Sequence, residues 1–370
     1  MKIAMVGWEY PPYVVGGLGV HCAMLTRELA RQGVDVHFYK PRIGPSPTDR
    51  HLTFHEVDVN VPRSAGGYEL SDFWGAVAEY NRKLPAEFDP SGVSLVHCHD
   101  WIGASASIEI SKRYSIPLVV TVHSTEYDRS AFFNPQPWIM NIESTMVNRA
   151  VRVIAVSGYT KRLVCDHYGR CEGVTVVHNG FNPPRVTKPD YRRQGRIIFL
   201  GRLTPQKGPR YLVQAAAKAL KYEDFTVIFA GSGSAEWEIR ETASVLGISS
   251  KISLLGRLSD AEIANWMMRS DAYVLPAVSE PFGMTVLEAM SAGLPTLISR
   301  TTGVGEALFH ALRFDFWDTL EIADLMIALE RSESLRRTLG LEGMRESAKF
   351  TWEKCGLQTL GVYREVVPLG

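Results

Sequence analysis

The chain has 370 residues, a length that suits two α/β domains better than one core. Its 40 Lys and Arg residues balance its 40 Asp and Glu residues, so the formal net charge of zero disfavours a nucleic-acid partner or an anionic membrane surface held by charge. Hydrophobic residues make up 45% of the chain and charged residues 22%, as in soluble globular proteins, and no apolar run approaches the roughly 18 residues that span a bilayer.

The N-terminus and the cysteines together predict a cytoplasmic protein. After Lys2 the apolar stretch is short, which is typical of a first β-strand and not of a signal peptide. The cysteines are odd in number and form no CxxC pair, so they indicate reduced, structural thiols. They are Cys22, Cys98, Cys165, Cys171 and Cys355.

Short apolar runs alternate with amphipathic helical stretches through the first half, the pattern of a parallel α/β sheet. The helical pattern at 19–33 ends at Gly33, as a C-terminal cap would. Strands are expected at 2–7, 34–40, 52–57, 94–99, 117–123, 152–157 and 174–179.

The stretch 182–195 is rich in Pro and charge and predicts an interdomain linker. After it, strands are expected at 196–201, 225–231, 252–256, 272–276 and 295–299. A helical stretch from about residue 318 and a final helix at 350–367 end the chain. The prediction is α/β with two Rossmann-like, doubly wound domains at 1–181 and 196–349, followed by a C-terminal helical segment at 350–370.

In a parallel sheet, ligands bind beyond the carboxyl ends of the strands. In the first such loop, Gly16 and Gly17 open a helix whose free N–H groups favour an anion, although a glycine turn alone is a common structural feature. The dinucleotide fingerprint G-x-G-x-x-G fails, because its last position is Cys22 when counted from Gly17 and Glu236 when counted from Gly231. A nicotinamide-dependent dehydrogenase is therefore the weaker interpretation.

Two cations follow the first strand of the second half. Arg202 and Lys207 stand in the loop between this strand and a helix that starts near Pro209. At a strand end and a helix N-terminus, such a pair suits a diphosphate, whose charge grows as it departs as a leaving group. The alternative is a solvated surface pair.

Two carboxylates, Glu280 and Glu288, stand eight positions apart around another helix start. The residues at 282–285 occupy the first turn of that helix, where free N–H groups can hold sugar hydroxyls or phosphate oxygens. Glu288 is placed to reach a ribose and Glu280 a hexose. A glycosidase acid/base pair is the alternative, but glycosidases need no adjoining diphosphate site.

A metal-dependent hydrolase is a further alternative. His97, His99 and Asp100 lie at one strand end and His123 at the next. Because H-x-H on a strand aims both rings to one side, this arrangement suits zinc. It leaves the cations and carboxylates of the second half without a role.

These segments resemble the GT-B retaining glycosyltransferases of the group that includes bacterial and archaeal glycogen synthases and the group-1 and family-4 transferases. The resemblance covers nearly the whole chain. It rests on the pairs Arg202/Lys207 and Glu280/Glu288 and on the segments GGLG, HCHDW, TVHS, VSGYTK, HNGF and EPFGMTVLEAMSAGLP.

The resemblance implies roles for individual residues. Arg202 and Lys207 would hold the donor diphosphate and stabilise the departing nucleotide. Glu280 and His123 would contact the donor sugar, and Glu288 the ribose. The remaining donor contacts would come from Gly16, Gly17, Asp100, Gly283, Met284, Thr285, Arg257 and Leu258, and the final helix would cross back to the N-terminal domain.

The predicted function is glycogen synthase-like transfer of a hexose, with glucose favoured, from UDP- or ADP-glucose to an α-glucan. No metal and no cofactor beyond the donor are expected. Glycogen and starch synthases carry Lys where this chain has Val14, which leaves the donor nucleotide open. Transfer to a lipid, small molecule or other polysaccharide, an inverting transferase, a UDP-sugar epimerase and a nucleotide-sugar sensor also stay open.

Overall fold

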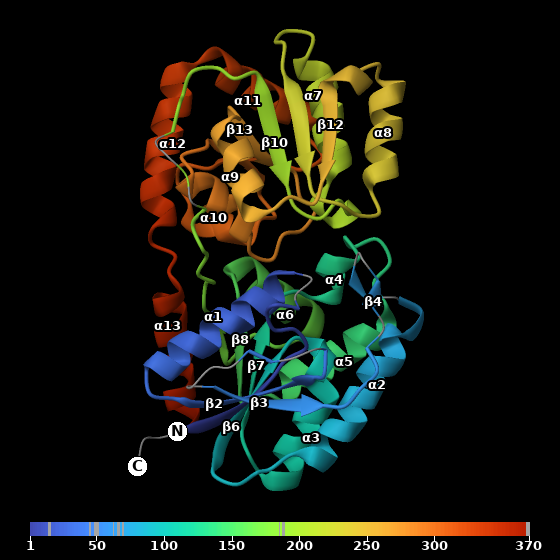
Figure 1. The fold of residues 1–370 in the computed structure, drawn as a ribbon, viewed down its shortest axis with the longest axis vertical. Coiled ribbons are helices and arrows are strands. Elements are labelled where there is room, and N and C mark those ends of the chain that lie inside the picture. Colours follow the sequence, from blue (N-terminus) through green and yellow to red (C-terminus); the bar gives the residue numbers. More distant parts are fainter. Residues whose placement is uncertain are drawn as a thin grey trace. The chain divides into compact units, whose positions relative to one another are not determined.

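The computed structural model describes residues 1–13, 16–43, 46–47, 52–61, 63–64, 67–68, 70–184, 186 and 189–367. The chain forms two compact units (Figure 1). Unit 1 comprises residues 1–126, 135–180 and 351–370. Unit 2 comprises residues 127–134 and 181–350.

Unit 1 is built on a seven-stranded parallel sheet in the order β3-β2-β1-β6-β7-β8-β9. All seven strands confirm predicted ones. In most of them the inner positions are apolar and buried, as expected of a sheet covered on both faces, whereas β3 is buried only at its two ends. The strands are β1 (Lys2–Val6), β2 (Asp35–Pro41), β3 (Leu52–Val57), β6 (Val93–His99), β7 (Leu118–Val122), β8 (Arg152–Ala155) and β9 (Val174–Val176).

The helices of unit 1 alternate with these strands along the chain, and a two-stranded hairpin lies between β3 and β6. The helices are α1 (Gly17–Arg31), α2 (Leu70–Glu87), α3 (Ala104–Tyr114), α5 (Pro137–Arg149), α6 (Gly158–Tyr168) and α13 (Trp352–Val366). The short helix α4 (Glu126–Arg129) begins at the last residue of a unit 1 segment and continues into unit 2. The hairpin strands are β4 (Arg63–Ser64) and β5 (Gly67–Tyr68).

The last helix, α13, belongs to unit 1 and packs against α1, as the resemblance implied. Gly356 makes this approach possible, because a Cβ atom there would lie 2.7 Å from the Cβ atom of Glu28 on α1. Further along α13, the Tyr363 hydroxyl lies 2.6 Å from Nδ1 of His97 on β6. The C-terminal helix thus completes the core of unit 1.

Cys165 and Cys171 form a disulfide at the end of α6. The prediction of five reduced thiols is wrong for this pair. Gly169 lies between them in the left-handed conformation, with φ of 68°, and turns the chain back toward the helix. The other three cysteines are free and buried.

Unit 2 contains a six-stranded parallel sheet in the order β12-β11-β10-β13-β14-β15. Five strands confirm the prediction, and β15 was missed because its run is only three residues long. The strands are β10 (Arg196–Leu200), β11 (Thr226–Ala230), β12 (Ile252–Gly256), β13 (Ala272–Leu275), β14 (Thr296–Ser299) and β15 (Leu312–Phe314).

The long helical stretch predicted from residue 318 divides at Ser332, whose hydroxyl caps the second of two helices. None of the described helices in either unit is long and apolar enough to cross a bilayer. The helices of unit 2 are α7 (Pro209–Ala219), α8 (Glu236–Val245), α9 (Asp260–Met268), α10 (Met284–Ser291), α11 (Thr319–Arg331) and α12 (Glu333–Ser347).

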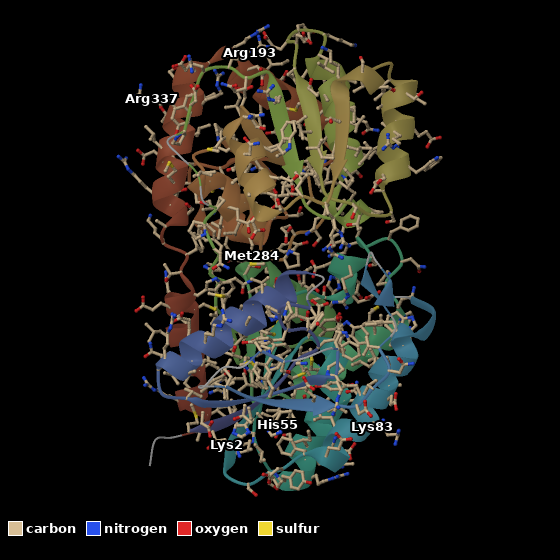
Figure 2. All side chains as sticks on the ribbon, in the orientation of Figure 1. Lys2, His55, Lys83, Arg193, Met284 and Arg337 are labelled. Atoms are coloured by element: carbon tan, nitrogen blue, oxygen red, sulfur yellow. A yellow bond between two sulfur atoms is a disulfide. The ribbon has the colours of Figure 1, made fainter. Side chains whose placement is uncertain are left out.

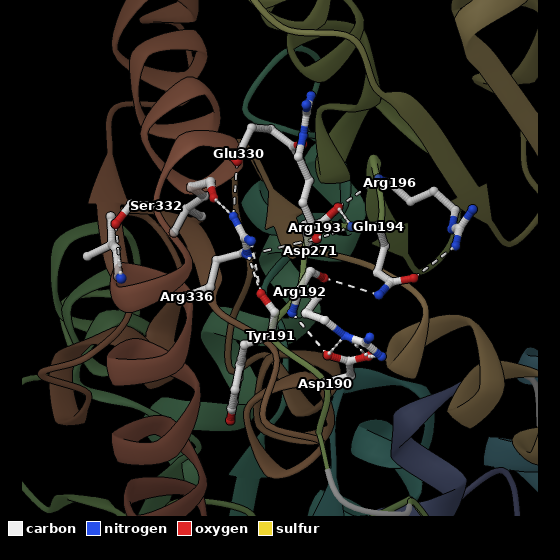
Figure 3. A network of polar contacts seen from close by, with 12 residues as sticks. Asp190, Tyr191, Arg192, Arg193, Gln194, Arg196, Asp271, Glu330, Ser332 and Arg336 are labelled. Atoms are coloured by element: carbon white, nitrogen blue, oxygen red, sulfur yellow. Dashed lines mark hydrogen bonds and ion pairs between the residues drawn. The ribbon is translucent and has the colours of Figure 1, made fainter.

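The end of the expected linker is fixed within unit 2 by a polar network (Figure 3). The Asp271 carboxylate accepts hydrogen bonds from the backbone N–H groups of Gln194 and Arg196. The buried Arg336 guanidinium donates to the Tyr191 carbonyl and lies 3.8 Å from Asp271. These contacts set the start of β10, the strand that leads to the cationic loop.

Candidate active site

The unit 2 sheet changes direction between β10 and β13, which are neighbours although β11 and β12 come between them in sequence. Loops after two such strands diverge and leave a crevice at the carboxyl edge. The loop after β10 contains Arg202 and Lys207, and the loop after β13 contains Glu280. The predicted cations and one predicted carboxylate therefore stand at the switch point.

Direct contacts join these two loops. The Nζ atom of Lys207 lies 2.6 Å from Oε2 of Glu280, with the two side chains only 13% and 12% exposed. The Gln206 carbonyl accepts hydrogen bonds from the backbone of Val278 and Ser279. The Lys207–Glu280 ion pair is therefore held by the backbone on both sides.

Gly208 is required at the end of the cationic loop. Its φ of +62° lies in the left-handed region, and a Cβ atom would come within 2.0 Å of the Pro276 carbonyl oxygen. Any larger residue would push the two loops apart. The glycine thus fixes where Lys207 stands.

Arg202 differs from Lys207 in its environment. Its side chain is exposed. Within the described part of the chain, its guanidinium has no ion-pair or hydrogen-bond partner. The loop therefore presents one cation paired with Glu280 and a second that is available to an anionic ligand.

The first turn of α10 lies beside this pair in sequence. Gly283 precedes the helix with a φ of +106°, and Met284 is its first residue (labelled in Figure 2). The Thr285 hydroxyl lies 2.9 Å from the hydroxyl of Tyr273, which is buried on β13. Burial raises the pKa of Tyr273, and the nearby Glu280 and Glu288 raise it further.

Tyr273 was not predicted as a site residue. The available signal was a hydroxyl-bearing residue inside an otherwise apolar central strand, because a buried tyrosine hydroxyl needs a partner. It links β13 to the first turn of α10. It thereby positions the residues predicted to hold the donor.

Glu288 lies one turn into α10, and its environment favours the neutral acid. Burial raises the pKa of its carboxyl to about 7, and the negative charge of Asp260 adds to the shift. A neutral carboxyl group can both donate and accept a hydrogen bond, as a ribose hydroxyl does.

Arg257 and Leu258 follow β12, two strands away from the switch point on the β11 side. The Arg257 side chain is exposed, and its Nε lies 3.3 Å from the Ser232 hydroxyl in the loop after β11. Leu258 is partly buried. All predicted unit 2 residues thus occupy the carboxyl edge of one sheet.

In unit 1, Asp100 and His123 follow the adjacent strands β6 and β7. Oδ1 of Asp100 accepts a 2.7 Å hydrogen bond from the backbone N–H of His123 and a longer one from that of Ser124. Asp100 itself has a φ of +56°, an uncommon conformation for a residue other than glycine. The contact holds the His123 loop against the end of β6.

His123 belongs to a cluster of imidazoles that also contains His21 of α1 and His99 of β6. The ring nitrogens Nδ1 of His99 and Nε2 of His123 are 3.0 Å apart. Burial lowers the pKa of His123 to about 3, and the nearby His97 contributes to the shift. The ring is therefore neutral near pH 7. The sequence did not predict the participation of His21.

The glycines at the start of α1 are exposed. Gly16 caps the helix without a side-chain hydrogen bond, and Gly17 is its first residue. Val14, on which the donor question rests, lies outside the described residues.

A cluster of three tryptophans in unit 1 includes Trp101, the residue that follows Asp100. Trp74 of α2 and Trp138 of α5 have ring centroids 4.8 Å apart, and Trp101 lies within 5.8 Å of both. Trp74 is 40% exposed and Trp138 45%, whereas Trp101 is buried. Apolar aromatic rings are therefore open to solvent beside the carboxyl edge of the sheet.

The two doubly wound parallel sheets, with a C-terminal helix that returns to unit 1, define the GT-B class of fold. Two family models cover the chain accordingly. Residues 15–185 match "Glycosyltransferase Family 4", and residues 186–343 match "Glycosyl transferases group 1". The chain belongs to the group-1 glycosyltransferases of GT-B fold and is a transferase.

Relatives agree over the full length. The chain is 29% identical to an uncharacterized glycosyltransferase of Methanocaldococcus jannaschii, with 98% of each chain covered. It is 27% identical to a glycogen synthase of Mycobacterium tuberculosis, over 98% of this chain and 94% of the relative. Sucrose-phosphate synthase from Thermosynechococcus elongatus matches in structure with a TM-score of 0.82 at 18% identity, over 99% and 98% of the two chains.

Proposed function

We propose that the chain is a retaining hexosyltransferase that moves glucose from UDP- or ADP-glucose to an α-glucan acceptor. The observation that carries the proposal is the Lys207–Glu280 ion pair beside the available Arg202 at the switch point of unit 2. A diphosphate needs cations, and the hexose attached to it needs a hydrogen-bond acceptor close by. The likeness to a glycogen synthase supports the choice of glucose and of a glucan.

In this proposal the donor lies along the carboxyl edge of unit 2. Arg202 and Lys207 bind the diphosphate, and Glu280 accepts hydrogen bonds from the hexose. The amides of Gly283 and Met284 contact the sugar. The remaining unit 2 contacts are Thr285 with phosphate, Glu288 with the ribose, and Arg257 and Leu258 with the nucleobase.

In this proposal, catalysis of the transfer step depends on Arg202 and Lys207. As the bond from the anomeric carbon to the phosphate oxygen breaks, negative charge develops on the diphosphate, and fixed cations stabilise it without reorganising. We propose that the acceptor hydroxyl attacks from the face that the diphosphate leaves and passes its proton to the departing phosphate oxygen. This course retains the anomeric configuration and needs no carboxylate nucleophile and no metal.

The unit 1 residues have supporting roles in the proposal. His123, neutral near pH 7, lies against the donor sugar. Asp100 acts through the backbone of His123 and is a positioning residue, because its Oδ1 already accepts two amides. Gly16 and Gly17 contribute amides to the phosphates.

The tryptophan cluster Trp74–Trp101–Trp138 is the proposed acceptor surface. Aromatic faces stack on the apolar faces of sugar rings, and two of these side chains are open to solvent. A glycan acceptor fits this surface better than a lipid or a small phosphorylated acceptor, which remain the alternatives to test.

The proposal includes a cytoplasmic location. The Cys165–Cys171 disulfide argues against this location, because disulfides are rare in reducing compartments. A count of free thiols in protein isolated under non-reducing conditions tests the location separately, because five free thiols would fit a reducing compartment.

The test of the function is a panel of donors and acceptors with purified full-length protein. UDP-glucose and ADP-glucose are each offered with glycogen, maltooligosaccharides and a lipid acceptor, and the anomeric configuration of the product is determined. Lys207→Ala and Arg202→Ala are each expected to lower kcat by about 10²–10³-fold. Arg210→Ala, which removes an exposed cation of α7, is the matched control.

Four outcomes contradict the proposal. Inversion at the anomeric carbon excludes the front-face course. Isomerisation of the donor without an acceptor indicates an epimerase, and binding without turnover indicates a sensor. A kcat of Lys207→Ala within a few-fold of the parent removes the cation from the mechanism.

A further inference from the structure

Two buried imidazole nitrogens in unit 1 have no hydrogen-bond partner in the described part of the chain. They are Nε2 of His21 and Nε2 of His99. Both side chains are almost completely buried, with relative exposures of 3% and 1%. Since buried polar atoms are nearly always paired, each such atom points to a water or an ion.

The tautomer of His21 is fixed by its surroundings. Its Nδ1 lies 3.0 Å from the amide oxygen of Asn179, so Nδ1 carries the proton and Nε2 keeps a lone pair. Metal-binding histidines characteristically donate their second ring N–H to a carbonyl or carboxylate oxygen in this way. His21 thus has both the free lone pair and the outer partner of a metal ligand.

Three imidazoles converge at this point. One ring nitrogen from each of His21, His99 and His123 lies within 4.8 Å of the others. Nδ1 of His99 and Nε2 of His123 are 3.0 Å apart and share a hydrogen bond, which a metal would replace, because two nitrogens bound to one tetrahedral zinc at about 2.1 Å lie about 3.4 Å apart. Small ring rotations would bring the third nitrogen into range.

The neighbouring His97 does not share these properties. Its Nδ1 lies 2.6 Å from the Tyr363 hydroxyl and its Nε2 lies 2.8 Å from the Thr121 hydroxyl. Both nitrogens are satisfied, so His97 is a core residue. The H-x-H pattern on β6 therefore provides one candidate ligand and one structural histidine, and α1 provides the ligand that the sequence did not reveal.

We propose that His21, His99 and His123 form a binding site for a divalent transition metal of the zinc and cobalt class. Three neutral nitrogen ligands and a fourth position for water or solute make the familiar open zinc geometry. Imidazole nitrogens suit zinc, cobalt, nickel and copper, whereas magnesium and calcium prefer oxygen ligands. Burial lowers the pKa of all three histidines, so the rings are neutral near pH 7 and bind metal without first losing a proton.

The metal would act as an inhibitor and not as a cofactor. This clause rests on the proposed function, in which His123 lies against the donor sugar. A metal would hold the His123 ring toward His21 and His99 and remove one of its two nitrogens from that contact. Zinc is therefore expected to inhibit transfer competitively with the donor.

The site is tested with metal alone, without donor or acceptor. Full-length protein is stripped with a chelator, freed of it and titrated with Co²⁺. We expect one equivalent to bind, with the strong visible bands of four-coordinate cobalt, and Zn²⁺ but not Mg²⁺ to displace it. Because no substrate is present, failure of the proposed function leaves this result intact.

Substitutions test whether the metal binds at His21, His99 and His123. His21→Gln is expected to weaken Co²⁺ binding at least about 100-fold, and Asn179→Ala about 10–100-fold by releasing the His21 ring. The matched control is His55→Gln, which breaks the other close imidazole pair of unit 1, His37 with His55 at 2.8 Å, and should leave binding unchanged.

X-ray absorption of the zinc-loaded parent protein needs no variant and should show three imidazole ligands. The proposal is overturned if neither metal binds at one equivalent, if the spectrum shows fewer than three imidazoles, or if binding survives His21→Gln and is lost in His55→Gln.

Discussion

Replacing Glu288 by glutamine should stabilise the protein at alkaline pH. Burial raises the pKa of this carboxyl to about 7 in the folded chain, against an ordinary value of 4.5. Below pH 4.5 the group is protonated in both the folded and unfolded states, so its contribution to the unfolding free energy is complete. As the pH rises toward 7 the unfolded chain ionises first, and the folded chain progressively loses that stability.

The size of the effect follows from the two pKa values. At 1.36 kcal/mol for each pH unit between 4.5 and 7, ionised Glu288 destabilises the folded state by about 3 kcal/mol. Glutamine carries no charge at any pH. Glu288→Gln should therefore raise the unfolding free energy by up to about 3 kcal/mol at pH 8 and leave it nearly unchanged at pH 4.5.

Calorimetric thermal unfolding of parent and variant at pH 4.5 and pH 8 is the assay. A gain of about 3 kcal/mol corresponds to a rise in Tm of roughly 6–12 °C for a unit of this size. Glu262→Gln is the control, because hydrogen bonds from Ser259 lower the pKa of Glu262 and its ionised form is the favoured one. Equal gains at both pH values, or no gain at pH 8, would refute the reasoning. The same variant should also bind donor more weakly.

Other predictions test the acceptor surface, the core and the thiols. Trp138→Ala should raise the acceptor KM about tenfold without changing the donor KM. The control Trp237→Ala, which removes an exposed ring of α8, should change neither KM. An effect of Trp138→Ala on the donor KM would contradict the assignment. Arg336→Met should lower the unfolding free energy by about 3–5 kcal/mol in urea titrations, because Asp271 then stays buried without its cation, and a loss below 1 kcal/mol would argue against that network. Denatured, unreduced protein should show three reactive thiols and reduced protein five; five in both cases would exclude the Cys165–Cys171 disulfide.

The sequence predicted the sheets because most of their strands are apolar and buried. A strand covered on both faces by helices reads as a continuous apolar run, as β1, β7 and β10 do, whereas β3 and β12 were predicted although they are only partly buried. β15 was not predicted, because a run of three residues has too little hydrophobic pattern to be distinguished from a loop. The disulfide was not predicted, because sequence spacing does not show that the turn after α6 brings Cys165 and Cys171 together.

The unit 2 site was predictable for a topological reason. Once the strands are known, the carboxyl ends of β10 and β13 become neighbours at the switch point, and polar residues in the two following loops must approach one another. Lys207 and Glu280 do so, at 2.6 Å. The role of Tyr273 was not predictable, because its partner Thr285 depends on the rotation of α10 about its axis and not on strand order.

His21 was missed for a related reason. On an amphipathic helix, a buried histidine has the same pattern as any core residue, and nothing in the sequence shows that α1 turns it toward β6 and β7. A strand fixes side-chain direction with a period of two, so the histidines of HCHDW could be assigned to one face, whereas helix rotation is set by packing.

In the proposed function, the ion pair at the switch point prepares Lys207 and Glu280 for a charged donor. Before the donor binds, Lys207 is neutralised by Glu280 while both side chains are largely buried, so the protein does not hold a buried, unpaired cation. An ammonium group has three N–H donors and Glu280 uses one, which leaves two directions for phosphate oxygens. Arg202, exposed at the other end of the loop, adds charge without requiring burial. In the proposed mechanism, the arrangement would therefore stabilise charge most strongly when the diphosphate carries its full charge, as the bond between the anomeric carbon and the phosphate oxygen breaks.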